Sequence, residues 1–373
     1  MPQSSTLFQQ VQAMIPRAVF ARLVTEWRGD YKVHFVDCWS HFLCLLWSLC
    51  THRSSLRDVE ASIASRQRFL RRFGLMTGRR ASVARANAHR PWQVAAGLFS
   101  ALVQRFAQVH PPHRLPVSAK LYTLDATVVD LCASLFRWAR LSADQAGVKL
   151  NVVLDHDGRV PVMVDVTSAR WHEIRWARTL AVPAGAVLCF DKGFFDLAWF
   201  WTLTQRGCWF VTRFKQRTRY RVIKSRRPQG TSGVVADQII RFSGDKSKRV
   251  YPGRLRLIDY VDPQTKRSYR FLTNQVTEDA RTICAIYKAR WQIELFFKWI
   301  KGNLKIKSFF GRSDNAVRWQ LYVAFCLYLI LAYLKYRLKL TWSLRRIHRL
   351  LEQHLFERVA LKTLLYGSYQ FQT

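Results

Sequence analysis

The spacing of apolar residues changes twice along this 373-residue chain, and that change limits the folds open to it. Residues 1 to about 115 repeat apolar positions at helical spacing, as in Phe42, Leu45 and Leu49. Short runs rich in Val and Leu follow, in AKLYTLDATVVDL, GVKLNVVLDHDGRVPVMVDVTS and GAVLCFDKGF. They are typical of strands, the second one folded as a hairpin. From Glu278 the helical period returns, so we expect an α/β core between helical segments.

Changes in composition divide the chain further. The proline-rich HPPHRLP at 110–116 is typical of a linker, and residues 216–276 are polar and basic with short alternating runs. We therefore predict a helical N-terminal domain at 1–115 and a first core segment at 116–215. A β-rich insertion at 216–276, a core helix within 277–315 and C-terminal helices at 316–373 complete the prediction.

The charge balance indicates a polyanionic partner. Lys and Arg number 60 against 24 Asp and Glu, a net charge of +36. Such a surplus favours nucleic acid, with an anionic membrane as the weaker alternative. The longest apolar run, residues 321–334, is shorter than the roughly 18–20 residues that cross a bilayer, so we expect a buried helix and no membrane partner. Eight cysteines without a CxxC pair indicate reduced thiols and a cytoplasmic protein.

Carboxylates inside apolar, strand-like runs are the first candidates for a site. Asp125 interrupts YTLDATVV and Asp191 interrupts VLCFDKGF, where an ionised group is costly unless it is paired or metal-bound. Asp37 and Asp165 share this feature, so each one alone is a weak signal. A hydrogen-bonded or ion-paired structural aspartate is the alternative.

A third carboxylate lies in the helix expected from Glu278. At 100° per residue, one narrow stripe collects Tyr287, Arg290, Glu294, Lys298 and Lys301. The opposite, core-facing side holds Ile286, Ile293, Phe296, Ile300 and Leu304. A solvated face with ion pairs at i±4 is the simpler interpretation of the stripe. However, three carboxylates in a strongly basic protein also suit divalent ions such as Mg²⁺ that act on phosphodiesters.

These residues resemble the Tyr-Arg-Glu-Lys signature of bacterial insertion-sequence DDE transposases, in insertion-sequence family four. YKARWQIELFFKWIK places Tyr287, Arg290, Glu294 and Lys301 on the signature without a gap. LDATVVDLCASLF resembles the block of the first aspartate and FDKGFFD that of the second, which assigns those roles to Asp125 and Asp191. The resemblance extends over nearly the whole chain.

The resemblance implies a ribonuclease-H-like core with a β-rich insertion and an enzyme that performs cut-and-paste DNA transposition. Asp125, Asp191 and Glu294 would be catalytic and hold two Mg²⁺ ions, with Mn²⁺ as a substitute. Tyr287, Arg290, Lys298 and Lys301 would contact DNA. The substrates would be terminal inverted repeats and target DNA, handled by a homodimer at the bacterial nucleoid. A metal-dependent nuclease and a non-catalytic basic DNA-binding protein are the alternatives.

Two finer expectations concern DNA recognition. Related enzymes flip a base at the transposon end, and the insertion offers six aromatic candidates to hold it: Tyr220, Phe242, Tyr251, Tyr260, Tyr269 and Phe271. The basic stretches RSSLRDVE and RRFGLMTGRR favour the N-terminal helices for recognition of the transposon ends.

Overall fold

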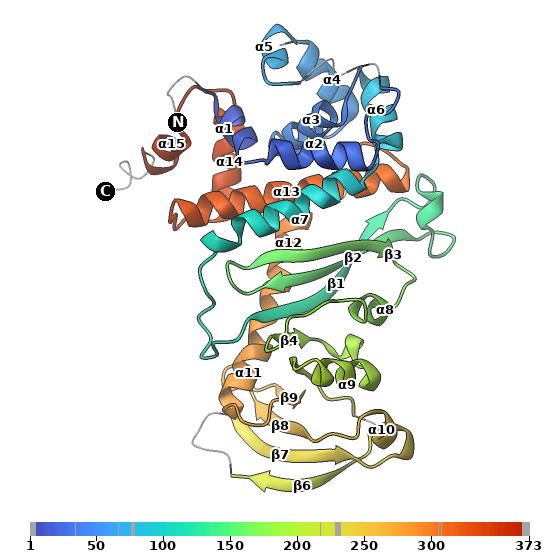
Figure 1. Ribbon diagram of the computed structural model, residues 1–373, viewed down its shortest axis with the longest axis vertical. Helices are drawn as coiled ribbons and strands as arrows, with labels where there is room; N and C mark the ends of the chain where they lie inside the picture. The colour runs from blue at the N-terminus through green and yellow to red at the C-terminus, as the bar shows by residue number, and fades with distance from the viewer. Residues whose placement is uncertain are drawn as a thin grey trace. The chain divides into compact units, whose positions relative to one another are not determined.

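The computed structural model describes residues 5–33, 35–65, 67–75, 79–216, 218–227, 233–304, 306 and 308–367, and divides into two compact units (Figure 1). The first unit comprises Met1–Pro111, Val128–Val148 and Phe297–Thr373, and the second comprises Pro112–Thr127 and Lys149–Phe296. The strands are β1 (Leu121–Leu131), β2 (Ala146–Asp155), β3 (Val160–Ser168), β4 (Val187–Phe190), β5 (Trp209–Arg213), β6 (Tyr220–Arg226), β7 (Val234–Phe242), β8 (Leu255–Val261) and β9 (Ser268–Thr273). The helices are α1 (Leu7–Ala13), α2 (Arg17–Glu26), α3 (Cys38–Cys50), α4 (Leu56–Ala64), α5 (Gln67–Arg71), α6 (Arg80–His89), α7 (Gln93–Phe106), α8 (Glu173–Ala177), α9 (Leu197–Gln205), α10 (Asp245–Val250), α11 (Ala280–Ala289), α12 (Trp291–Asn303), α13 (Asp314–Arg337), α14 (Leu344–His354) and α15 (Leu361–Gly367), with 3-10 turns η1 (Ala107–Val109), η2 (Arg137–Ala139) and η3 (Lys192–Phe194).

The described strands join one sheet in the order β3-β2-β1-β4-β5-β9-β8-β7-β6. Strands β1, β4 and β5 are parallel neighbours, and β5 then pairs antiparallel with β9. The remaining pairs, β9 with β8, β8 with β7 and β7 with β6, are also antiparallel. The segment predicted as a β-rich insertion therefore continues the sheet of the core, and β6 is its edge strand.

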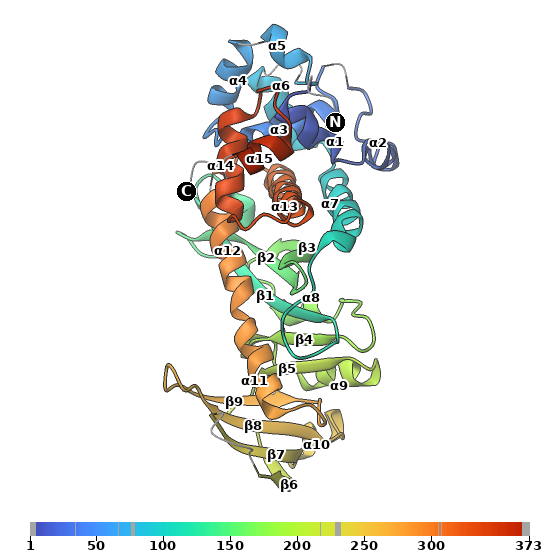
Figure 2. The ribbon, with the colours of Figure 1, turned by 90° about the vertical axis from the view of Figure 1, so that its left-hand side faces the viewer.

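Alternating side chains give the second unit two apolar layers, because neighbouring residues of a strand point to opposite faces. On one face Leu188 and Phe190 pack in a cluster with Phe200 of α9. On the other face Val187 and Cys189 pack in a cluster with residues of α11. Figure 2 shows α11 alongside β5 and β9. The sheet is thus covered by α9 on one side and by α11 on the other.

The N-terminal and C-terminal helices pack together in the first unit. Trp92 stacks on Tyr322 with ring centroids 5.5 Å apart, and Phe106 stacks on Tyr333 at 4.1 Å, which joins α7 to α13. Helix α13 is long and apolar enough to pass for a membrane span, but 89% of its apolar window is buried within the protein. This agrees with the buried helix predicted around residues 321–334.

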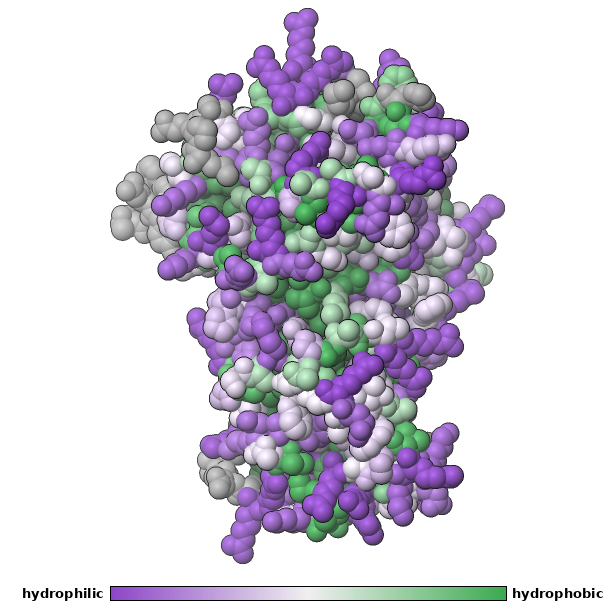
Figure 3. All heavy atoms as spheres, viewed as in Figure 1, coloured by the Kyte–Doolittle hydropathy of each residue, from purple (hydrophilic) through white to green (hydrophobic). Residues whose placement is uncertain are grey.

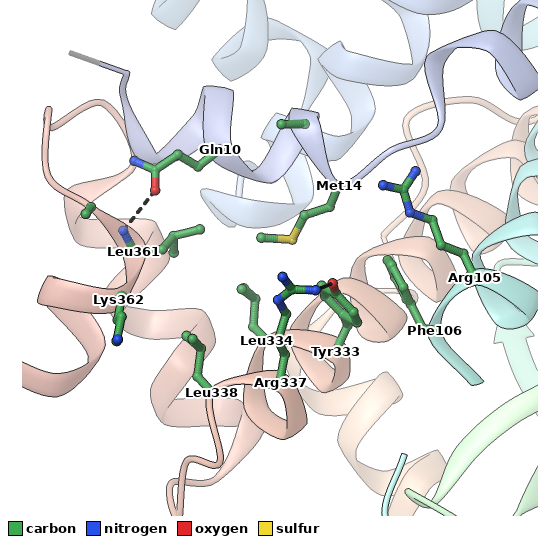
Figure 4. Close-up of a pocket in the computed structure, with 12 residues that line it drawn as sticks. Gln10, Met14, Arg105, Phe106, Tyr333, Leu334, Arg337, Leu338, Leu361 and Lys362 are labelled. Atoms are coloured by element: carbon green, nitrogen blue, oxygen red, sulfur yellow. Dashed lines mark hydrogen bonds between the residues drawn. The ribbon is translucent and has the colours of Figure 1, made fainter. Parts of the chain in front are cut away.

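The two ends of the chain also meet in the first unit. Gln10 Oε1 of α1 accepts a hydrogen bond from the Leu361 backbone N–H at 2.9 Å, drawn in Figure 4, and Gln10 Nε2 donates to Val359 O at 2.8 Å. Beside this contact lies a hollow of about 350 Å³, lined mainly by apolar side chains that include Met14 and Leu334. Hydrogen bonds from residues 359 and 361 therefore hold the C-terminal segment against helix α1.

The stretch from Arg53 to Gly74 forms two helices, α4 and α5, and α4 starts at a capping box in which Ser55 and Asp58 bond each other's backbone N–H. Two local expectations need correction. Asp37 is not in a strand but caps α3, since its Oδ1 accepts from the Ser40 N–H at 2.7 Å. The helix expected from Glu278 is interrupted at Arg290, between α11 and α12. Within RRFGLMTGRR, residues 76–78 lie outside the described residues.

Buried histidines predict a loss of stability in mild acid. Burial lowers the pKa of His41, His156 and His348 from 6.5 to about 4, so each is neutral in the folded protein. As the pH falls below 6.5, the histidines of the unfolded chain take up protons while the buried histidines of the folded protein stay neutral. The free energy of unfolding therefore decreases as the pH falls from 6.5 toward 4, by about 1.4 kcal/mol per pH unit for each histidine. We expect the thermal midpoint to fall clearly between pH 7 and pH 5. His41→Gln should lessen that fall; an equal fall would contradict a neutral, buried His41.

Candidate active site

The strand register brings Asp125 and Asp191 together. Leu124 of β1 pairs with Phe190 of β4 in parallel register, so Asp125 follows within β1 and Asp191 is the first residue after β4. Asp191 therefore does not interrupt a strand, as the sequence suggested, but follows the end of one. Leu124 and Phe190 both contribute to the core on the α9 side. By alternation, the two aspartates belong to the opposite face, which α11 covers.

The backbone after β4 fixes Asp191 locally. Asp191 caps η3, and its Oδ1 accepts a hydrogen bond from the Gly193 N–H at 2.7 Å. Thr212 Oγ1 of β5 donates to the Asp191 carbonyl at 3.2 Å. A Cβ built on Gly193 would lie 2.8 Å from Asp191 Oδ1, closer than such contacts occur. The glycine in FDKGF therefore leaves room for the Asp191 carboxylate.

Arg290 bridges the first aspartate and the glutamate. Arg290 Nη1 donates to Asp125 Oδ2 at 3.1 Å, and Arg290 Nη2 donates to Glu294 Oε1 at 2.5 Å. The Arg290 and Asp125 side chains are only 17% and 20% exposed. Within the polar stripe predicted from the sequence, Arg290 is thus turned toward β1 and is largely withdrawn from solvent. The i+4 pair that the solvated-face interpretation expected does form, but as part of this bridge.

The three carboxylates belong to neighbouring elements, because Asp125 and Asp191 follow register partners of β1 and β4 and Arg290 links Asp125 to Glu294. Burial raises the pKa of Asp125 to about 6, opposed by the Ala126 N–H and Arg290 and reinforced by the negative charges of Asp191 and Glu294. Burial alone would lower the pKa of Arg290, but Tyr287, Asp125 and Glu294 hold it above its usual value. The positively charged Arg290 guanidinium therefore lies between the carboxylates of Asp125 and Glu294, whose negative charges repel each other.

Tyr287 lies on the same side of the sheet as this bridge. Its ring packs against Phe271 with centroids 4.7 Å apart, and the Arg290 guanidinium lies 5.7 Å from the ring centroid. Burial raises the pKa of Tyr287 well above its usual value, so its hydroxyl stays protonated and can donate a hydrogen bond. The opposite helix face is buried as expected at Ile286, Ile293, Phe296, Ile300 and Leu304.

The two lysines of the stripe belong to the first unit. Lys298 is exposed, and Lys301 Nζ donates to the Val128 carbonyl of β1 at 2.7 Å. Asp125, Asp191, Tyr287, Arg290 and Glu294 all belong to the second unit.

A hollow of about 420 Å³ adjoins Arg290 and Glu294. Sequence reasoning left Arg213, Arg267, Lys288 and Trp291 out of the site, although all four line this hollow. Trp291 is 56% exposed and directly follows Arg290, a position that could have suggested a role. Of the six aromatic candidates in the insertion, the hollow is lined by Tyr260, Tyr269 and Phe271.

Carboxylate oxygens are typical ligands of a hard divalent cation, so Asp125, Asp191 and Glu294 could hold one. The Arg290 guanidinium already lies between two of these carboxylates. Among the described residues, however, no group of three or more His, Cys, Asp or Glu side chains is placed to hold a metal ion as it stands. In this arrangement Arg290 donates to one oxygen of Asp125 and to one oxygen of Glu294.

Comparison with known proteins finds two matching families and several similar proteins. The family described as "Transposase DDE domain" matches residues 118–330, and a domain of unknown function, DUF4372, matches residues 3–76. The chain is 36% identical over 282 residues to a protein of Sinorhizobium fredii named as transposase y4zB, covering 74% of this chain and 77% of that protein. It is 31% identical over 215 residues to a Geobacillus stearothermophilus protein named as a transposase for insertion sequence element IS5377, covering 57% and 56%. A cryo-EM structure of a piggyBac transposase synaptic complex with hairpin DNA aligns with 98% of this chain and 81% of its own, at 10% identity and a TM-score of 0.46.

Proposed function

The chain belongs to the transposase DDE domain family, and from that premise we propose that it moves an insertion sequence of family four by cut-and-paste transposition. Membership confirms three predictions: a ribonuclease-H-like core, a DNA transposase, and an enzyme that cleaves DNA and transfers strands. The family generally uses divalent metal ions. The finer steps described below are proposals.

The observation that carries the proposal is the convergence of Asp125, Asp191 and Glu294 in the second unit. Two of them follow paired residues of parallel strands, and the third is bridged to the first through Arg290. Two carboxylates that follow register partners of neighbouring strands repel each other, so their placement is unfavourable for folding unless a cation lies beside them. Grouped carboxylates of this kind are typical of a cation site.

We propose that Asp125, Asp191 and Glu294 are the catalytic carboxylates and together hold two Mg²⁺ ions, with Mn²⁺ as a substitute. Such ions, when bound, activate the attacking oxygen and stabilise the leaving oxygen of a phosphodiester. In this proposal the three side chains supply the negative charge that retains the cations. Gly193 keeps the Asp191 carboxylate in place through its N–H.

We propose that Arg290 releases Asp125 and Glu294 when the metal ions bind and that it then contacts DNA. Its planar guanidinium can donate two parallel hydrogen bonds to a phosphate, as it now donates to Asp125 and Glu294. We propose that Arg290 and the protonated Tyr287 hydroxyl grip phosphates near the reacting bond, and that Lys298 and Lys301 contact the same DNA. Tyr260, Tyr269 and Trp291 offer aromatic faces on which a base released from the duplex could stack.

The remaining parts of the proposal concern assembly. We assign DNA-end recognition to the N-terminal helices within 1–115, a role supported by the basic residues of RSSLRDVE and RRFGLMTGRR. Two transposon ends must be cut and joined together, so a homodimer bound to terminal inverted repeats and target DNA is the expected active form. A cytoplasmic protein associated with the nucleoid fits this function.

The test is incubation of the purified protein with a labelled duplex that carries the element's own terminal inverted repeat, with Mg²⁺ and separately with EDTA. We expect metal-dependent nicks at the element boundary, hairpin ends and strand-transfer products, and none of them on a random duplex. A fluorescent adenine analogue at the terminal base should brighten if that base leaves the stack.

Each other result has a defined meaning. Cleavage without joining would favour a nuclease on the same core. Binding without any product would contradict the proposed chemistry and favour the non-catalytic DNA-binding protein. Cleavage that persists in EDTA would contradict the metal role of the three carboxylates.

A further inference from the structure

A second basic hollow lies in the second unit, built by residues that the proposed chemistry does not use. Its volume is about 700 Å³, and it is formed by the start of β6, the end of β7, α10 and the residues next to α10. The charged side chains that line it are Arg221, Arg241, Lys248, Arg249 and Asp245. Four basic groups thus meet a single acid. The face drawn in Figure 3 shows hydrophilic side chains, with hydrophobic ones between them, at its lower end, where Figure 1 labels these three elements.

The strand register places two of the cations directly against each other. Arg221 of β6 and Arg241 of β7 are register partners in an antiparallel pair, so their side chains leave the same face side by side. Like charges in directly opposed positions destabilise a strand pair. Among the described residues that line the hollow, Asp245 is the one acidic side chain that can offset this repulsion, against four basic ones.

One donor in the hollow is also unsatisfied. Arg241 Nε is buried and has no hydrogen-bond partner among the described residues. A buried guanidinium N–H without an acceptor is costly, because its hydration has been lost and nothing replaces it. An anion with several acceptor oxygens would satisfy this donor and relieve the repulsion between Arg221 and Arg241.

The neighbouring surface indicates that the anion is part of a long chain. Strand β6 is the edge of the sheet, and its Arg221 and Lys224 are exposed. The register of β6 against β7 shifts between Val222 and Lys224, so Arg221 faces Arg241 while Lys224 faces Ile239. Since residues 239 and 241 share a face, this bulge turns Lys224 to the same side as Arg221. Basic side chains therefore continue from the hollow along the edge strand.

We propose that this hollow binds backbone phosphates of duplex DNA, as a contact separate from the carboxylate site. The inference rests on the proposed function, because it takes the phosphate source to be the DNA on which the transposase acts. Arginine and lysine side chains that bind phosphates position the protein on the duplex but do not contact the bases. The site would therefore bind duplex DNA of any sequence.

The first test measures binding of a random-sequence duplex as salt is varied. Arg241→Gln with Lys248→Gln should lower the steepness of log K against log salt by about 0.9 for each phosphate that is no longer neutralised, and should weaken binding roughly 10- to 100-fold near 0.1 M salt. The matched control is Lys246→Gln with Arg254→Gln, two exposed cations of the same segment outside the hollow. Equal weakening in both double variants would overturn the proposal. Arg221→Gln with Arg249→Gln repeats the test if the first variant is unstable.

The second test uses the unaltered protein. Saturation with duplex should protect Lys248 from acetylation, read by mass spectrometry, while Lys246 on the same helix stays reactive. Unprotected Lys248, or equal protection by millimolar inorganic phosphate, would overturn the assignment to DNA. Because both readouts need only binding, a wild-type protein that protects Lys248 yet never cleaves would support this site and contradict transposition. A protein that cleaves the transposon end while Lys248 stays unprotected would support transposition and contradict this DNA-binding site.

Discussion

Asp125→Asn, Asp191→Asn and Glu294→Gln should each reduce DNA cleavage and strand transfer by roughly a thousandfold or more. Each change keeps the shape of the side chain but removes a negative charge that the proposed cations need, and such ions contribute several kcal/mol to the stabilisation of a transition state. Binding to the transposon end should be retained or become tighter, because a charge that repels phosphate is gone. The measurement is product formation on the end duplex with Mg²⁺, alongside a binding assay.

The chain offers a control on the same strand. Asp130 lies five residues beyond Asp125 on β1 and is exposed, so Asp130→Asn should leave cleavage unchanged. Thermal unfolding of every variant separates lost chemistry from lost folding. If Glu294→Gln still cuts with Mg²⁺ present, Glu294 is not a ligand, and its bond to Arg290 would be its main role.

The sequence places Asp125 and Asp191 at short apolar strands, but it does not show which strands are neighbours. Their adjacency depends on the parallel pairing of β1 with β4 and on its register, in which Leu124 is opposite Phe190. The core-facing side of the helix was correct, because a buried apolar stripe leaves little freedom of rotation.

The same patterns could not predict which partner a polar side chain chooses. Arg290 was placed beside Glu294 by helical spacing, but its bond to Asp125 joins residues 165 positions apart. Asp37 had the same apolar surroundings as Asp125, yet it caps a helix. The basic hollow depends on the register of β6 against β7 and on a bulge, neither of which leaves a periodic signal.

Asp237→Asn should lower the free energy of unfolding by about 3–5 kcal/mol, because it leaves Arg256 charged and buried without its partner. Arg256 Nε and Nη2 each donate to the Asp237 carboxylate at 2.7 Å, and the two side chains are only 3% and 7% exposed. The third donor, Arg256 Nη1, bonds the Glu278 carbonyl, just before α11 begins. The pair therefore joins β7 and β8 to the start of the helix that carries Tyr287.

A double variant separates the charge from the packing. Asp237→Leu with Arg256→Met removes both charges and keeps apolar volume, so urea unfolding should return most of the stability lost in Asp237→Asn. End cleavage should then show whether the Glu278 contact matters, because the double variant restores the core but not that hydrogen bond. If Asp237→Asn unfolds at the wild-type urea concentration, the carboxylate does not neutralise Arg256 in solution. A stable double variant that cleaves slowly would mean that Arg256 positions α11 for the reaction.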